Sequence, residues 1–212
     1  NNKTGANAKP KTVVDKNQDK RIRKIEKQLA AEGHYTTSSL SYANVDWDGD
    51  YLLINGLQTG DTTNERTGNR VYLKNLTYNF RIKNPTSSVA TMRFVLLVHK
   101  DPDQAIFVKS NIFANQASNA LDVYQMRDLD HYSEFRVLKD TIYTLPPTGQ
   151  DRPYSQVRAS VKLNMQTQYT GTGATISSIT KNSLYMIWYS DVDPAAGTKM
   201  EVKGGYQLTF NP

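Results

Sequence analysis

From residue 35 onward, the chain alternates apolar and polar positions over stretches of strand length. Residues 157–169 show this most clearly, because the odd positions from Val157 to Tyr169 are mainly apolar whereas the even positions are all polar. A period of two over this length indicates a strand with one buried and one solvated face, as in an antiparallel sheet. Similar stretches, separated by turn residues, predict eight strands. They lie at about 35–45, 51–55, 71–83, 90–100, 134–145, 156–169, 182–190 and 199–210.

Two of these strands carry irregularities. In 71–83 the apolar positions are odd at Val71 and Leu73 but even from Leu76 onward, so we expect a β-bulge near Lys74–Asn75. In the last strand, the pair Gly204-Gly205 predicts a bend or a bulge.

The strand pattern predicts an all-β fold, a single eight-stranded antiparallel jelly roll. Long connections at 101–133, 146–155 and 170–182 suit that fold, and we expect a short helix near 105–113 in the first of them. An immunoglobulin-like sandwich is usually nearer ~100 residues, whereas this chain has 212. No internal repeat or strong boundary follows residue 34, so we assign 35–212 to one folded domain.

Residues 1–34 form a predicted N-terminal arm with a helix at about 15–32. Asp15 is a candidate N-cap and Gly33 stands where a helix ends. The apolar seam is too narrow for the helix to fold alone, so it lies on its own domain, pairs with copies of itself or lies against nucleic acid. This seam consists of Ile22, Ile25 and Leu29.

The arm also carries most of the chain's net positive charge. The net charge is +6; residues 1–33 hold nine Lys or Arg and four acids, whereas the rest holds 17 basic and 16 acidic residues. Basic arms of this kind commonly bind polyanions, although a solubilising tail is the alternative. The candidate nucleic-acid-binding residues are Lys16, Lys20, Arg21, Arg23, Lys24 and Lys27.

The sequence offers little support for an enzyme. It has no cysteine, which excludes disulfides, thiolate metal sites and cysteine nucleophiles. Its three histidines are not spaced as metal ligands, and phosphate-binding, dinucleotide and G-x-S-x-G motifs are absent. A carboxylate pair assembled across strands stays open. No apolar run approaches the ~20 residues that a membrane helix needs, so we expect no membrane insertion.

One weak metal candidate lies in the segment DWDGDY. Calcium favours clustered carboxylates in loops, and Asp46, Asp48 and Asp50 stand at alternating positions. The EF-hand pattern fails, because its sixth and twelfth positions are Tyr51 and Leu57. The alternatives are a structural calcium site or a turn between two strands; we expect no other cofactor.

A set of motifs in order carries a family resemblance. The charged, turn-rich stretch GDTTNERTGNRVYLK spans 60–74, MRFVLLVHKDPD spans 92–103 and FRVLKDTIYTL spans 135–145. In this order they resemble the capsid proteins of small circular Rep-encoding single-stranded DNA viruses, and they are similar to the coat protein of satellite tobacco necrosis virus. The resemblance covers most of residues 15–145 and weakens after 146.

The resemblance implies a viral capsid protein, a virion component that assembles inside the host cell. Such proteins form small icosahedral shells, here T=1, with the basic arm inside on a single-stranded genome; DNA is favoured over RNA. Arm helices would bundle at the threefold axes through the seam, and a host receptor is not identified. Many relatives begin with a dense Arg-rich tract, so either such a tract precedes residue 1 or packaging uses fewer charges.

The resemblance also makes the stretch 60–74 a subunit contact through Glu65, Arg66 and Arg70. The alternative is that Arg66 and Gly68 only shape the start of the strand. A rival function is a carbohydrate-binding jelly-roll module, which the 13 tyrosines and long loops support but which leaves the arm unexplained. A jelly-roll enzyme is a second rival, without recognisable catalytic residues.

Overall fold

The structure is a computed structural model that describes residues 18, 20–21, 33–113 and 122–211. The chain divides into two compact units, residues 1–33 and 34–212. In the first unit the described residues are Gln18, Lys20, Arg21 and Gly33; all four are exposed, and the first three are helical. The rest of the predicted helix, with the seam Ile22, Ile25 and Leu29, lies outside the described residues.

The second unit contains the eight predicted strands and one further short strand. Five strands form one sheet, with bounds β1 His34–Val45, β3 Arg70–Lys83, β6 Tyr154–Tyr169, β7 Ile179–Lys181 and β9 Met200–Asn211. Four form the other, with bounds β2 Asp50–Leu53, β4 Ala90–His99, β5 Phe135–Leu145 and β8 Ser183–Ser190. Two 3-10 turns are η1 Lys109–Asn111, inside the region where we expected a short helix, and η2 Ile176–Ser178.

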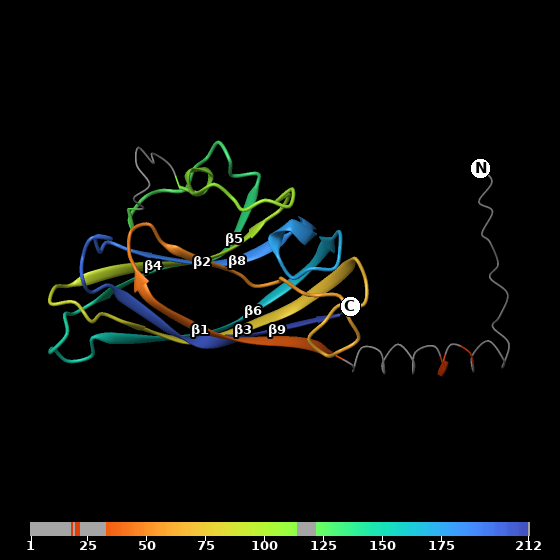
Figure 1. Cartoon of the computed structure of the whole chain (residues 1–212), viewed down its shortest axis with the longest axis horizontal. Helices are drawn as coiled ribbons and strands as arrows, with labels where there is room; N and C mark the ends of the chain where they lie inside the picture. The colour runs from red at the N-terminus through yellow and green to blue at the C-terminus, as the bar shows by residue number, and fades with distance from the viewer. Residues whose placement is uncertain (1–17, 19, 22–32, 114–121, 212) are drawn as a thin grey trace, which may run out of the picture. The chain divides into compact units, whose positions relative to one another are not determined.

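The strand order confirms the predicted jelly roll. The sheets have the orders β1-β9-β3-β6-β7 and β2-β8-β4-β5, and every pairing is antiparallel. The first strands pair with the last in nested fashion, because β1 pairs with β9, β2 with β8, β3 with β6 and β4 with β5. The chain is therefore one long antiparallel ribbon wrapped into two facing sheets, which is the double Greek key of a jelly roll (Figure 1).

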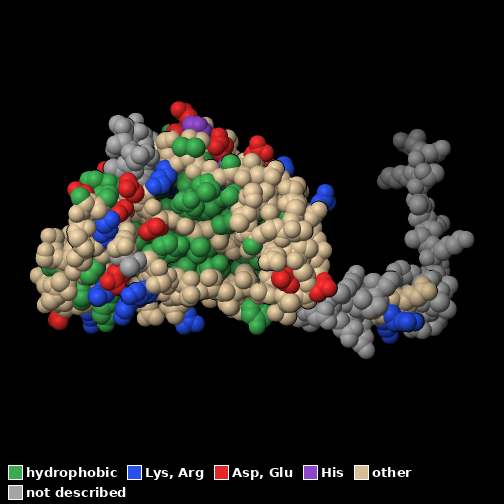
Figure 2. Space-filling view, in the orientation of Figure 1, with side chains coloured by type: hydrophobic (Ala, Val, Ile, Leu, Met, Phe, Trp, Pro, Cys, Tyr) green, Lys and Arg blue, Asp and Glu red, His purple; other side chains and the backbone are tan. Residues whose placement is uncertain are grey.

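The main core lies between the two sheets, where hydrophobic side chains gather (Figure 2). Its centre is aromatic: Phe80, Phe94 and Trp188 contact one another with ring centroids 5.1–5.9 Å apart. Phe80 comes from the five-stranded sheet, whereas Phe94 and Trp188 come from the four-stranded sheet. These rings join the two layers through the inward positions that the period-two pattern predicted.

A second core lies on the other face of the four-stranded sheet. Every residue of β4 and β8 is buried, so both faces of these strands are covered. The cover comes from the connection between β4 and β5, whose described parts are residues 100–113 and 122–134 and are drawn in green above this sheet (Figure 1). Phe107, Ile112, Phe113 and Val123 from this connection join a cluster with outward residues of the sheet.

The two predicted irregularities had different outcomes. The bulge is confirmed, because β3 shifts register between Leu73 and Asn75 against both of its neighbours. The prediction of a bulge at Gly204-Gly205 is wrong, since the register of β9 runs through both glycines without a shift. A side chain at Gly204 would collide with the backbone of Asn79 and Phe80, so this glycine serves the close approach of two strands.

Candidate functional site

The charged loop before β3 is organised around Arg66. This side chain has 0% exposure, and its guanidinium lies 4.3 Å from the centre of the Tyr169 ring. Its Nε donates to the carbonyl of Leu57 (2.9 Å), and its two Nη groups donate to the carbonyls of Gly68 (2.7 Å) and Gly171 (2.5 Å). Burial lowers the pKa of Arg66, and the Tyr169 side chain opposes that shift. Arg66 thus joins two loops of its own chain.

This geometry corrects part of the predicted subunit contact. Arg66 is fully buried, and its guanidinium donates hydrogen bonds to backbone carbonyls of its own chain, so it is not available to a neighbouring subunit. The structure agrees with the alternative, in which Arg66 shapes the start of the strand. Glu65 is partly exposed, and hydrogen bonds from the side chain and backbone of Thr62 lower its pKa. Arg70 is exposed at the first position of β3. For Glu65 and Arg70 the subunit contact stays a prediction.

The three aspartates of the candidate calcium site form a turn. Asp46 is buried, its Oδ2 accepts from Lys199 Nζ at 2.8 Å, and its Oδ1 accepts from the backbone N–H of Asp48 at 2.9 Å. Burial, followed by the charge of Asp46, raises the pKa of Asp50. Among the described residues, no group of three or more His, Cys, Asp or Glu side chains could hold a metal ion. The arrangement therefore gives the calcium site no support.

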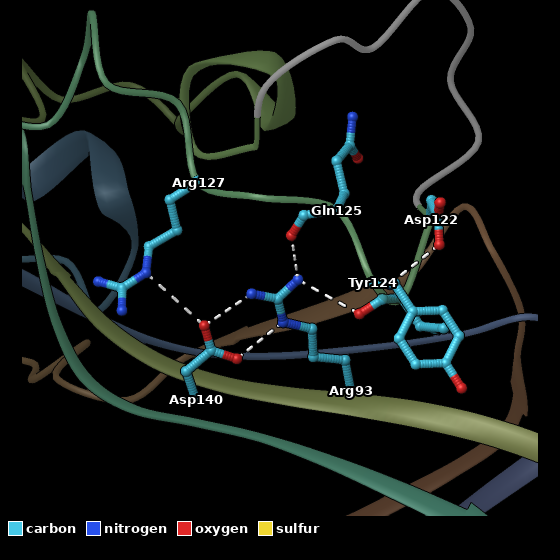
Figure 3. Close-up of polar contacts among 7 residues, drawn as sticks. Arg93, Asp122, Tyr124, Gln125, Arg127 and Asp140 are labelled. Atoms are coloured by element: carbon cyan, nitrogen blue, oxygen red, sulfur yellow. Dashed lines mark hydrogen bonds and ion pairs between the residues drawn. The ribbon is translucent and has the colours of Figure 1, made fainter.

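A buried ion pair on the outward face of β4 holds the β4–β5 connection to the sheet (Figure 3). Arg93 binds both carboxylate oxygens of Asp140 on β5, each at 2.7 Å. Its Nη1 also donates to the carbonyls of Val123 (3.3 Å) and Gln125 (2.5 Å) in the connection. Burial by itself lowers the pKa of Arg93, but the hydrogen bonds and charge of Asp140 help to raise it overall. Arg127 adds a weaker contact to Asp140 at 3.7 Å.

This anchored connection presents large apolar side chains to solvent. We call residues 124–132 the apolar loop, because four of its side chains are 64–80% exposed. They are Tyr124, Met126, Leu129 and Tyr132. Single exposed apolar side chains are ordinary, but four within nine residues make this loop a candidate interaction surface. From the sequence, this stretch was placed in the long connection 101–133, and none of its side chains was singled out.

The predicted nucleic-acid-binding residues fall almost entirely outside the described part of the chain. Lys20 and Arg21 are described, and both are exposed. The other four candidates, Lys16, Arg23, Lys24 and Lys27, lie outside it. Their role stays a prediction. No helix among the described residues has the length and apolar character to cross a membrane.

Comparison with known proteins finds likenesses of low sequence identity among solved structures. No family model and no curated protein matches the chain. Among solved structures it is similar to one of Desmodium yellow mottle tymovirus, with 12% identity and a TM-score of 0.35, over 84% of this chain and 85% of the other. It is also similar to the full particle of Israeli acute paralysis virus heated to 63 degrees, with 8% identity and a TM-score of 0.30, over 99% and 82%. The jelly-roll assignment therefore rests on the strand order described above.

We predict that Arg66→Ala lowers the free energy of unfolding by about 2–4 kcal/mol, because it leaves buried carbonyls without donors. Arg70→Ala, at an exposed position in the same region, should change it by less than about 0.5 kcal/mol. Urea titration of both variants checks this. Equal destabilisation by the two substitutions would contradict the organising role of Arg66.

A pH-dependent contact is expected between His131 and Asp128. His131 Nδ1 lies 2.7 Å from Asp128 Oδ2; this hydrogen bond raises the pKa of His131 above its ordinary 6.5 and lowers that of Asp128. The stabilisation from His131 is complete below pH 6.5 and is lost as pH rises through the raised pKa. The stabilisation from Asp128 is complete at pH values above its ordinary pKa, and it is lost as the pH falls through the lowered pKa that Asp128 has in the folded protein.

An NMR titration should show His131 titrating above its ordinary 6.5 in the native protein and at a lower pH in Asp128→Asn than in the native protein. The amides of residues 128–134 should lose hydrogen-exchange protection at alkaline pH only in the native protein. A His131 titration that Asp128→Asn leaves unchanged would show that the contact is absent.

Proposed function

We propose that this chain is a non-enzymatic viral capsid protein, which self-assembles into a closed shell around single-stranded nucleic acid. The observation that carries the proposal is a jelly-roll body preceded by a basic segment with nine Lys or Arg and four acids. Jelly rolls recur in viral capsids, lectins and cupins, so the fold alone does not choose among them. A basic arm ahead of β1 suits packaging of a polyanion and has no evident role in a sugar-binding module.

The exposed side chains of the apolar loop support the proposal that copies of this chain assemble. In a single subunit its four large side chains face water, although the connection that carries them is anchored by the Arg93–Asp140 pair. Burial of apolar surface contributes roughly 25 cal/mol per Å², so covering this loop with a neighbouring copy favours association. The same anchoring reduces the entropy lost on binding, because the loop is already held in place.

The family resemblance supports a more detailed proposal for the shell, its cargo and the residues that bind it. The shell is small and icosahedral with T=1 symmetry, the cargo is DNA rather than RNA, and Lys16, Lys20, Arg21, Arg23, Lys24 and Lys27 neutralise its phosphates. Glu65 and Arg70 serve as charged contacts between subunits. Binding through such an arm is electrostatic, independent of sequence and weakened by salt.

A carbohydrate-binding module is the second candidate. It is favoured by exposed tyrosines on the strands of the five-stranded sheet, since aromatic side chains suit a platform for sugar rings. These tyrosines are Tyr35, Tyr72 and Tyr154. This function predicts a monomer or a small oligomer that binds an oligosaccharide.

Sedimentation of the purified protein, with absorbance read at 260 and 280 nm, distinguishes a capsid protein from a carbohydrate-binding module. The proposal predicts uniform megadalton particles that carry nucleic acid, which nuclease digestion of the extracted cargo should identify as DNA. A monomer that persists across salt and pH, and binds oligosaccharide instead, would overturn the capsid function.

We further predict that Leu129→Asp prevents particle formation, because a charge enters an apolar contact between subunits. Ser133→Asp, which adds the same charge at an exposed position nearby, should still form particles. The unfolding free energy of either subunit should change by less than about 0.5 kcal/mol. Particles of normal mass from Leu129→Asp would exclude the apolar loop from the contact.

A further inference from the structure

The five-stranded sheet and the rest of the body carry opposite net charges. The five strands of the larger sheet, all within the described residues, contain eight Lys or Arg and a single acid, Glu201, for a net charge of +7. The remaining sequence from residue 34 onward contains nine basic and fifteen acidic residues, for a net charge of −6. All eight cations are exposed or partly exposed, so they do not belong to the apolar face between the sheets. The nearly neutral body therefore has a basic face, which we define as the outward face of the five-stranded sheet.

The centre of the basic face brings like charges together. Arg81 on β3 pairs directly with Lys203 on β9, and two residues along the sheet Asn79 pairs with Arg158 on β6. Like charges directly opposite each other across two strands are destabilising. Glu201 lies 3.4 Å from Lys203 Nζ, which offsets only part of this charge. The juxtaposition of Arg81, Lys203 and Arg158 thus favours an anionic ligand.

The same region is hollowed. Gly205 leaves β9 without an outward side chain between Ser39 on β1 and Asn79 on β3. A shallow depression of about 670 Å³ lies over this position and is lined by hydroxyl and amide side chains, including Thr37 and Gln207.

A second depression, of about 430 Å³, shares Asn79 and Gly204 with the first. Arg81, Lys203, Tyr154 and Gln156 line it. The Arg81 guanidinium lies 5.9 Å from the centre of the exposed Tyr154 ring. A cation and an aromatic ring are therefore side by side in a groove with polar walls.

We propose that this basic face binds the backbone of single-stranded nucleic acid, with Arg81, Lys203 and Arg158 on phosphates and Tyr154 beneath a base. A cationic groove with aromatic stacking surfaces is how proteins hold single strands without reading their sequence. A neutral sugar polymer would leave the opposed cations uncompensated. This inference deepens the proposed function, because it gives the folded body, as well as the arm, a part in holding the cargo.

The test uses the full chain with all nine Lys and Arg of residues 1–33 changed to Gln, so that binding by the body is measured alone. A fluorescent single-stranded oligothymidylate is titrated by anisotropy over a range of salt. In this background, Arg81→Gln with Lys203→Gln is compared with Arg136→Gln and Lys139→Gln, which removes two exposed cations of β5. Thermal unfolding checks that both proteins remain folded, and Arg158→Gln with Lys162→Gln provides a second pair on the basic face.

We expect either pair on the basic face to reduce the slope of log K against log salt by about 1.4, since each lost phosphate contact contributes about 0.7. The β5 pair should leave the slope unchanged. Tyr154→Ala should weaken binding roughly tenfold with the slope intact, because it removes stacking rather than charge.

Equal effects of the basic-face and β5 pairs would overturn the inference. Binding that disappears once the arm is neutral would also overturn it, while leaving the proposed function standing. No binding by the unaltered chain would overturn both. A basic-face pair that stops particle formation but leaves oligonucleotide binding intact would assign this face to a contact between copies of the chain.

Discussion

A β-sheet in water must bury at least one face, and the two sheets of this body meet that constraint differently. Both bury their inner faces against each other around Phe80, Phe94 and Trp188. The four-stranded sheet also buries its outer face beneath the β4–β5 connection, which makes β4 and β8 apolar on both sides. The outer face of the five-stranded sheet is exposed to solvent, and the cations of this sheet lie on that face. The body is thus two-sided: one side is basic, and the other carries the apolar loop.

The two-sided arrangement depends on Arg93. A buried charge costs several kcal/mol to desolvate unless its partners are well placed, and here a bidentate carboxylate and two backbone carbonyls meet the guanidinium. The same side chain therefore fixes the connection that covers the sheet. In the proposed shell, this anchoring sets the position of the apolar loop, while the basic face and the arm remain available to the cargo.

Local pattern was enough to predict most of the fold. Strand-length stretches between turn residues located eight of the nine strands, and the phase change in β3 located its bulge, because both depend on neighbouring positions of one strand. β7 was missed since three residues cannot show a period of two. Burial of both faces of β4 was not predicted from the sequence, because the segment that covers its outer face is the β4–β5 connection, which lies outside the strand.

Sites that depend on distant residues were harder to predict. The resemblance placed Arg66 in a contact between subunits, whereas its burial depends on Tyr169 and Gly171, about a hundred residues away. The basic face was missed for a related reason. Its cations come from four separate strands, β3, β6, β7 and β9, and along the sequence they are balanced by acids in loops that lie elsewhere.

The central claim is that one side of this body faces nucleic acid and the other does not. Ultraviolet cross-linking of the purified protein to the nucleic acid it carries, followed by mass spectrometry of the digested chain, tests it most directly. The account predicts cross-linked peptides from the arm and from β3, β6 and β9, with Tyr154 among the modified residues. Cross-links confined to β5 and the apolar loop would contradict it.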